Sequence, residues 1–310
     1  MGDFAFGRTP EMARTEEWKT AVRNLKRGMA LLGPFSPVPW LLKIGFSIPR
    51  LWIVRDFRDM VEWCKQCMRQ RMKMTVDKPD IASWLIEASK ADSKTIFSGN
   101  MDWIQGDSIT MIVAGSDTVA PSLVFAFYHL ARDPQHADKI RQELQTVESI
   151  YDTAALQKLK HLAAFTNEIL RLYPPTPTGG YRISPPQGLT IAGRYIPGNT
   201  TIVAPKYHIA RLESCFERAN EFIPERWYSR PEMVKDRRAF SPFAQGRYSC
   251  LGKNLALAEL HFMIALFASR YKIRFPEGDD GSRVVTEMKD CFTANPGPLK
   301  LVFEPLAGQE

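Results

Sequence analysis

Cysteine is scarce in this chain of 310 residues, and its distribution excludes a disulfide framework. The five cysteines are odd in number and scattered, which indicates a reducing compartment. Cys64 and Cys67 form a Cys-x-x-Cys pair, but no second Cys pair or Cys/His pair stands at zinc-finger spacing. The pair lies in a helical pattern rather than a β-α-β pattern. We therefore interpret it as two helix cysteines, and not as a zinc or redox site.

The sequence also lacks a long run of basic residues and an N-terminal signal peptide. Its net charge of +7 is spread along the chain, which excludes a nucleic-acid-binding arm and favours partners other than nucleic acid. A solvated basic surface is the simplest interpretation, and a basic face that docks an acidic protein is the alternative. The longest apolar stretch, residues 109–131, contains Asp117, Pro121 and His129, so we expect no transmembrane anchor in this chain.

Helical patterns dominate residues 1–172. Thr15 is the predicted N-cap of the first helix, and Asn100 or Asp102 that of a long helix over 102–132, which Asp133-Pro134 ends. The predicted helices cover residues 15–32, 51–74, 80–91, 102–132, 134–148 and 158–172.

The composition changes after Pro174-Pro175. Residues 173–249 are rich in Pro, Gly and β-branched side chains, which predicts a β-rich region and loop with a hairpin near 189–200 and a strand at 200–204. Residues 250–310 then contain a helix over 251–271 and a strand over 296–304. The predicted fold class is mainly α with a small β region (α+β).

The strongest chemical signal is a ten-residue segment that runs into the helix predicted at 251–271, Phe243-Ala244-Gln245-Gly246-Arg247-Tyr248-Ser249-Cys250-Leu251-Gly252. A thiolate ligand needs a loop whose backbone approaches a flat macrocycle closely, and Gly246 and Gly252 supply that freedom. It also needs positive potential, which Arg247 and the start of the following helix provide. Phe243 is expected to pack beside the sulfur. The pattern predicts that Cys250 is a metal ligand rather than a buried apolar residue.

This segment, F-x-x-G-x-x-x-C-x-G, resembles the haem-binding signature of the cytochrome P-450 family. Two further motifs follow the family's order: Glu168-Ile169-Leu170-Arg171 is similar to its helical E-x-x-R, and Pro224-Glu225-Arg226-Trp227 to its P-E-R-F/W. Glu168 and Arg171 share one face of a helix and can pair. The resemblance implies that Arg226 joins them in a structural cluster that holds the segment leading to Cys250. Alone, E-x-x-R would be read as a solvated ion pair.

A fourth motif, Ala114-Gly115-Ser116-Asp117-Thr118, resembles the family's distal [A/G]-G-x-[D/E]-T segment. A hydroxyl in a locally opened helix can hold water, and a nearby acid can supply a proton, so Asp117 and Thr118 are predicted catalytic residues. Pro121 makes the opening possible because it cannot bond back to the Asp117 carbonyl. The alternative is that Asp117 points at solvent or at an arginine.

The resemblance also implies contacts to haem (iron protoporphyrin IX), the expected cofactor, with Cys250 as axial thiolate. Arg182 matches a residue that binds a haem propionate, and His208 occupies the family's His/Asn-Arg region. Many relatives carry Arg two residues before the cysteine, whereas this chain has Tyr248 there and Arg247 one position earlier. The family pattern begins in mid-domain, so we expect residues 1–310 to form the C-terminal part of a single cytochrome P-450 domain that lacks its N-terminal part.

The resemblance implies a monooxygenase that inserts one oxygen atom from O2 into a small lipophilic substrate, in the manner of eukaryotic, especially fungal, secondary-metabolite enzymes. Its expected partners are NADPH-cytochrome P-450 reductase and cytochrome b5, at the cytosolic face of the endoplasmic reticulum membrane. Two alternatives stay open. The chain is a catalytically inactive fragment, or it keeps haem but works as an isomerase or dehydratase.

Overall fold

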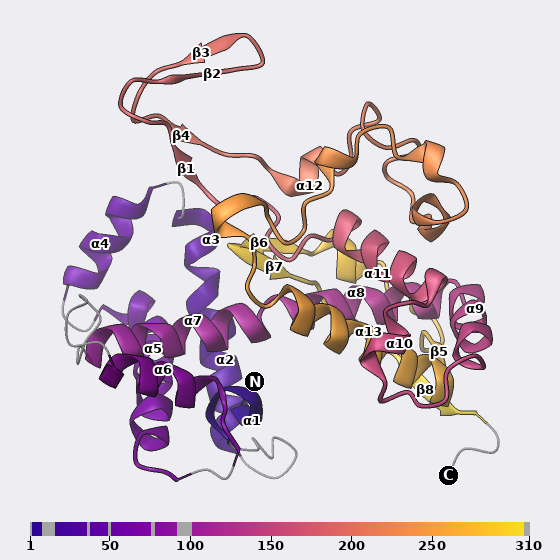
Figure 1. The fold of residues 1–310 in the computed structure, drawn as a ribbon, viewed down its shortest axis with the longest axis horizontal. Helices are drawn as coiled ribbons and strands as arrows, with labels where there is room; N and C mark the ends of the chain where they lie inside the picture. Colours follow the sequence, from indigo (N-terminus) through magenta and orange to yellow (C-terminus); the bar gives the residue numbers. More distant parts are fainter. Residues whose placement is uncertain are drawn as a thin grey trace. The chain divides into compact units, whose positions relative to one another are not determined.

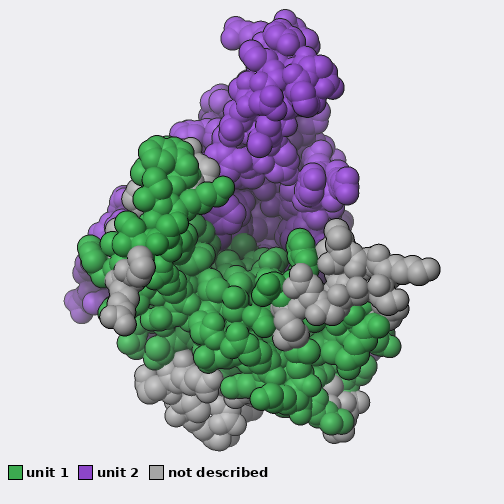
Figure 2. Space-filling view, turned by 90° about the vertical axis from the view of Figure 1, so that its left-hand side faces the viewer, with its two compact units in different colours: residues 1–118 green, residues 119–310 purple. Residues whose placement is uncertain are grey.

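The structure of this chain is a computed structural model that describes residues 2–7, 16–35, 38–48, 51–75, 78–91 and 101–306. The chain forms two compact units, Met1–Thr118 and Val119–Glu310, which Figure 2 colours green and purple. The expected caps Thr15 and Asn100 lie outside the described residues, and Asp102 lies in the first turn of its helix. That the chain forms part of one domain stays a prediction.

The first unit is helical because its long helices carry apolar stripes at helical spacing. In α5 the buried side chains lie on one face of the helix, at Met60, Cys64, Cys67, Met68 and Arg71, and the helix packs against α2 and α7. The helices of this unit, several of which Figure 1 labels, are α1 (Gly2–Phe6), α2 (Glu16–Ala30), α3 (Leu32–Phe35), α4 (Pro39–Ser47), α5 (Arg55–Arg71), α6 (Ile81–Ala91) and α7 (Met101–Ser116), with a 3-10 turn η1 (Trp52–Val54).

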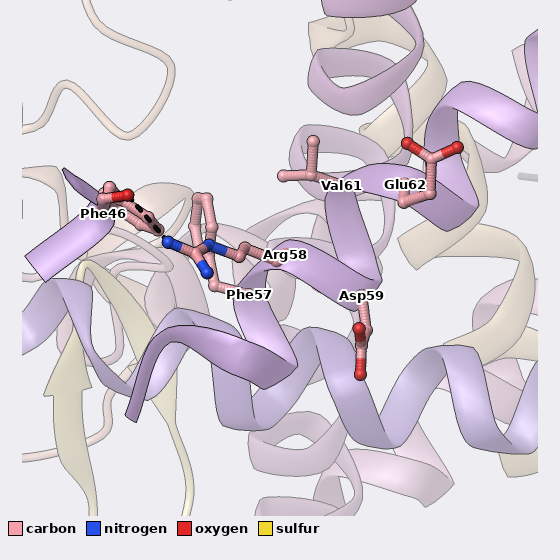
Figure 3. A pocket seen from close by; sticks show the side chains of 6 residues that line it. All are labelled: Phe46, Phe57, Arg58, Asp59, Val61 and Glu62. Carbon is pink, nitrogen blue, oxygen red and sulfur yellow. Dashed lines mark hydrogen bonds between the residues drawn. The ribbon is translucent and has the colours of Figure 1, made fainter. Parts of the chain in front are cut away.

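A shallow depression of about 400 Å³ lies between the end of α4 and the first turns of α5 (Figure 3). Arg58 donates from Nη2 to the carbonyls of Phe46 (2.7 Å) and Ile48 (3.1 Å), which satisfies carbonyls at the end of α4. Figure 3 shows the carboxylates of Asp59 and Glu62 pointing away from each other and from Arg58. The depression therefore lies at a junction of two helices, and its charged side chains do not converge on a common point.

The second unit is built on helices α8 (Val119–Arg132), α9 (Gln135–Leu144), α11 (Lys160–Leu172) and α13 (Lys253–Arg270), with the one-turn helices α10 (Thr153–Leu156), α12 (Lys206–Ile209) and α14 (Arg283–Thr286). Buried side chains of α8, α11 and α13, among them Phe125, Leu162 and Ile264, form its core. The helix predicted at 251–271 is α13, and Asp133-Pro134 ends α8 as expected. The strongly apolar α13 is the helix that follows the cysteine loop.

The long helix predicted over 102–132 is divided in the structure. Helix α7 ends at Ser116, Asp117 and Thr118 form a turn, and α8 begins at Val119. The physical reason is local: Pro121 has no N–H to give the Asp117 carbonyl, and the Thr118 hydroxyl donates to the Ala114 carbonyl at 2.7 Å. By length and composition, Asp102–Arg132 is the stretch of the described chain apolar enough to cross a membrane.

The strands of the second unit pair in four short antiparallel ladders. The hairpin predicted near 189–200 turns at Ala192 and Gly193, both at positive φ (49° and 77°), the geometry of a two-residue hairpin turn. The strand predicted at 200–204 is shorter and pairs with β1, placing Arg182 opposite Ile202. The ladders are β1 (Arg182–Ile183) with β4 (Thr201–Ile202), β2 (Leu189–Ile191) with β3 (Arg194–Ile196), β5 (Tyr271–Arg274) with β8 (Val302–Pro305), and β6 (Lys289–Cys291) with β7 (Thr293–Asn295).

Between α12 and α13 the chain forms 3-10 turns where the sequence had predicted a β-rich region and loop. Two of them begin at prolines, Pro224 and Pro231, whose fixed φ suits the first position of a helical turn. The turns are η2 (Pro224–Trp227), η3 (Pro231–Met233), η4 (Arg237–Ala239) and η5 (Gly246–Tyr248). This irregular segment leads directly to Cys250.

Candidate active site: the Cys250 loop and its buried support

The loop from Phe243 to Cys250 folds back on itself. The Cys250 N–H donates to the Phe243 carbonyl at 2.8 Å, and Ala244 and Gly246 take positive φ values of 57° and 73°. Positive φ is costly for a residue with a Cβ, so Gly246 suits its position and Ala244 is locally strained. Gly252 is the N-cap of α13. The thiol therefore stands two residues before the N-cap of an 18-residue helix, at the end that carries the partial positive charge of the helix dipole.

The surface around the thiol is exposed and partly apolar. Cys250 and all residues from Gln245 to Leu255 are exposed, and Leu251 is fully so. Phe243, by contrast, packs against the core of the unit. No group of three or more His, Cys, Asp or Glu side chains that could hold a metal ion occurs in the described ranges. A single open thiol beside apolar surface could supply the protein ligand of an iron that is held in a flat apolar macrocycle, so these residues fit haem.

Positive charge gathers beside the loop. The guanidinium of Arg182, from β1, lies 5.2 Å from the centre of the Tyr248 ring, and that of Arg247 lies 6.0 Å from the same ring. The structure thus brings these three predicted cofactor-binding residues together. His208 is exposed in α12 with its ring 5.8 Å from that of Tyr207, so it does not join this group.

Glu168, Arg171 and Arg226 form a fully buried cluster, as the motifs had predicted. Glu168 Oε2 accepts from Arg171 Nε at 2.9 Å, Oε1 accepts from Arg171 Nη2 at 2.8 Å, and Oε1 also accepts from Arg226 Nε at 3.0 Å. All three side chains are fully excluded from solvent. Ion pairs of this kind are costly to bury unless every group is bonded, and here the partners are close and well aligned.

The arginines of this cluster also bond the irregular segment that precedes the cysteine loop. Arg171 Nη1 donates to the carbonyls of Ala210 and Ala219, both at 2.6 Å, and Arg226 Nη1 donates to that of Glu217 at 2.8 Å. A segment with few backbone ladders of its own is thereby held by charge-assisted hydrogen bonds from a helix and a 3-10 turn. The cluster holds the path of the chain toward Cys250.

Two residues that contact the site were not predicted from the sequence. Trp227 donates from its indole nitrogen to Glu168 Oε2 at 2.9 Å, and its ring packs at a tilt of 45° against that of Phe240, with 4.4 Å between the ring centres, shortly before the loop. The signal was visible in Pro-Glu-Arg-Trp, because a buried indole N–H needs an acceptor. The second is Lys206, which bonds the Pro242 carbonyl at 3.2 Å. No sequence motif near Lys206 predicts that contact.

Asp117 and Thr118 lie at the turn between α7 and α8, where both are half-buried. The Thr118 hydroxyl is directed at the Ala114 carbonyl, and the Asp117 N–H donates to the Val113 carbonyl at 3.0 Å. The helix is therefore opened at the position that the motif had indicated. The roles of these two residues in proton delivery stay predictions.

Comparison with known proteins identifies the family of this chain. The sequence model of the cytochrome P-450 family matches residues 1–303. The chain belongs to the cytochrome P-450 family. It is 36% identical over 297 residues to the cytochrome P-450 monooxygenase notG' of Aspergillus versicolor, covering 94% of this chain and 54% of that relative. It is also 37% identical over 296 residues to tryprostatin B 6-hydroxylase of Aspergillus fumigatus, covering 94% and 52%.

The fold is shared with a solved member of the family. The heme domain of cytochrome P-450DA superposes with a TM-score of 0.74 at 18% identity, covering 98% of this chain and 63% of that one. The predicted fold class is thereby confirmed. The chain spans about half the length of the curated relatives described above. Haem with a cysteine thiolate ligand is the cofactor that family and fold imply.

Proposed function

We propose that this chain carries the catalytic part of a monooxygenase whose haem is ligated by Cys250. The observation that carries the proposal is the loop itself: an exposed thiol at the start of α13, held by a hydrogen bond to Phe243 and bordered by apolar surface and arginines. The reaction would place one atom of O2 in a C–H or C=C bond of a small lipophilic substrate. The other atom would be reduced to water, which consumes two electrons and two protons.

Each group of residues has a defined task in this proposal. The Cys250 thiolate binds the iron, and haem when bound supplies the activation of O2. Gly246 and Gly252 let the backbone approach the ring, while Arg182, Arg247 and Tyr248 bind its carboxylates by charge and hydrogen bonding. Glu168, Arg171 and Arg226 hold the loop in place.

The opened turn after α7 would handle protons. The Thr118 hydroxyl would hold a water molecule in place of its bond to the Ala114 carbonyl, and the Asp117 carboxyl would pass protons to that water. Retention of both residues favours oxygen insertion over an isomerase or dehydratase role.

We also propose the biological setting on the strength of the relatives. One of them is named for hydroxylating tryprostatin B, which supports a role in fungal secondary metabolism. The expected electron donor is NADPH-cytochrome P-450 reductase, with cytochrome b5 as a second donor, at the endoplasmic reticulum membrane surface. The net charge of +7 favours docking to acidic partners of this kind.

The test is the carbon-monoxide difference spectrum of the reduced chain after expression with a haem precursor. A red-shifted Soret band in the wild type, lost in Cys250→Ala and kept in Cys215→Ala, supports the proposal. Cys215 is a matched control because it is a half-buried free cysteine outside the loop. If the wild type binds no haem, the proposal is wrong for this chain, and the inactive-fragment interpretation is favoured.

A further inference from the structure

Lys206 is a half-buried lysine beside the cysteine loop that no motif includes. It is the first residue of α12, after Pro205. Its aliphatic stem packs on Gly179, which has a φ of +80°. A Cβ at Gly179 would come within 3.6 Å of Lys206 Cγ and 3.0 Å of the Ala204 carbonyl. The stem of Lys206 therefore passes beside Gly179, at a distance where an added Cβ would touch it.

The ammonium of Lys206 bonds the start of the cysteine loop. Its Nζ donates to the carbonyl of Pro242 at 3.2 Å, across 36 residues of sequence. The next residue, Phe243, accepts the N–H of Cys250 at 2.8 Å. Lys206 thus bonds Pro242, and the residue next to Pro242 accepts the hydrogen bond from Cys250. One hydrogen bond from Lys206 therefore holds the segment to which the cysteine is itself bonded.

The charge of this ammonium is not balanced by a carboxylate. Lys206 forms no ion pair with Asp or Glu in the part of the chain that the structure describes, unlike Lys139, which lies 2.6 Å from Glu225. Burial lowers the pKa of Lys206. Cys250 raises this pKa, and the positive charge of Arg182 lowers it further. A half-buried cation beside a second cation is costly without an anion. If Cys250 binds the haem iron as a thiolate, as proposed above, its sulfur supplies such an anion.

We propose that Lys206 is a positioning residue of the Cys250 loop, which holds the Pro242 carbonyl and keeps a positive charge beside the segment to which Cys250 is hydrogen-bonded. This inference rests on the proposed function, because it assigns Cys250 as the haem ligand. A positive charge near a thiolate-bound iron stabilises the reduced, more negative state. Lys206 therefore raises the reduction potential as well as ordering the loop.

The first measurement is the ferric/ferrous reduction potential of the haem-loaded chain. Lys206→Met removes the charge and the donor, Lys206→Arg keeps both, and Lys235→Met is the matched control. Lys235 also donates to a backbone carbonyl, that of Glu213 at 2.8 Å, but is exposed and outside the loop. We expect Lys206→Met to shift the one-electron equilibrium toward the oxidised form on the order of tenfold, about 59 mV. The other two variants should stay at the wild-type value.

The second measurement is amide hydrogen exchange of residues 243–250 in the chain without haem. Lys206→Met should exchange at least roughly tenfold faster there, the effect of losing one hydrogen bond to a charged group, with α11 unchanged as a check on folding. Wild-type exchange and potential in Lys206→Met would overturn the inference. A wild-type chain that never forms thiolate-bound haem would instead contradict the proposed function, and the exchange result alone would then decide on Lys206.

Discussion

At the scale of single residues, Glu168 is the shared hydrogen-bond acceptor of the buried cluster that supports the candidate site. It accepts five hydrogen bonds, from two arginines, the Trp227 indole and the Ile223 backbone. A buried carboxylate with these partners cannot be removed without leaving two guanidinium groups uncompensated. Its contribution therefore exceeds that of any exposed ion pair in the unit.

Glu168→Gln should lower the free energy of unfolding by about 3–5 kcal/mol. The matched control is Glu304→Gln, because Glu304 pairs with Arg274 at 2.6 Å but both side chains are exposed. That change should cost about 0–1 kcal/mol. Urea unfolding of the two variants measures the difference. Equal losses would show that the cluster is not the support of the unit.

Thr118 is the second residue whose substitution is informative. Thr118→Ala should leave haem binding unchanged and lower the yield of product per NADPH severalfold, because the Thr118 hydroxyl would no longer hold the water that passes protons from Asp117, and NADPH would be consumed without product. Thr110→Ala is the control, since Thr110 makes the same kind of bond, to the Gly106 carbonyl at 3.2 Å, within α7. Product and NADPH consumption are assayed together. Unchanged coupling in Thr118→Ala would refute the proton-delivery role.

At the scale of elements, two buried histidines join α9 to α11. His136 Nδ1 lies 3.2 Å from His161 Nε2, and His161 Nδ1 lies 3.2 Å from the Tyr228 hydroxyl, just after η2. Around them stand Asp133, the Lys139–Glu225 pair and Glu143, which bonds the His161 backbone. Burial lowers the pKa of both imidazoles, that of His161 to about 4. The rings are therefore neutral in the folded protein at neutral pH.

This junction should make stability depend on pH. Unfolded His161 titrates near its ordinary pKa of 6.5, above its folded value of about 4. The unfolded chain therefore binds more protons between these values, and stability is lost as the pH falls from about 6.5 toward 4. The slope reaches up to about 1.4 kcal/mol per pH unit for one histidine. Unfolding free energies measured over this range should vary less in His161→Gln than in the wild type. In the exposed control His208→Gln they should vary as much as in the wild type. Equal slopes in all three proteins would contradict this account.

At the scale of the whole molecule, each unit has a hydrophobic core of its own. Met68 is fully buried in the core of the first unit, and Leu162 in that of the second. Separate cores allow separate unfolding transitions.

Met68→Ala and Leu162→Ala should each cost about 2–5 kcal/mol through the cavity left behind. We expect hydrogen exchange to speed up in α5 and α7 for the first variant and in α8 and α11 for the second. Exchange measured by mass spectrometry on the whole chain distinguishes the two patterns. If either substitution loosened all four helices equally, the chain would unfold as one cooperative domain.

The sequence by itself determined the features that depend on neighbours within a few residues. The loop at Cys250 follows from its glycines and the helix after it, the Glu168–Arg171 pair from i,i+3 spacing, and the end of α8 from Asp133-Pro134. Backbone preference and helix periodicity act over such short distances, so spacing was sufficient to predict them.

Only the tertiary structure decided which distant groups meet. The Trp227 indole reaches Glu168 across 59 residues, Lys206 reaches Pro242 across 36, and His161 reaches Tyr228 across 67. These contacts depend on the path of an irregular segment made of 3-10 turns, which has no periodicity for a sequence pattern to reveal. The buried charges and polar groups specify that path, because each must find a partner when the surrounding core excludes water.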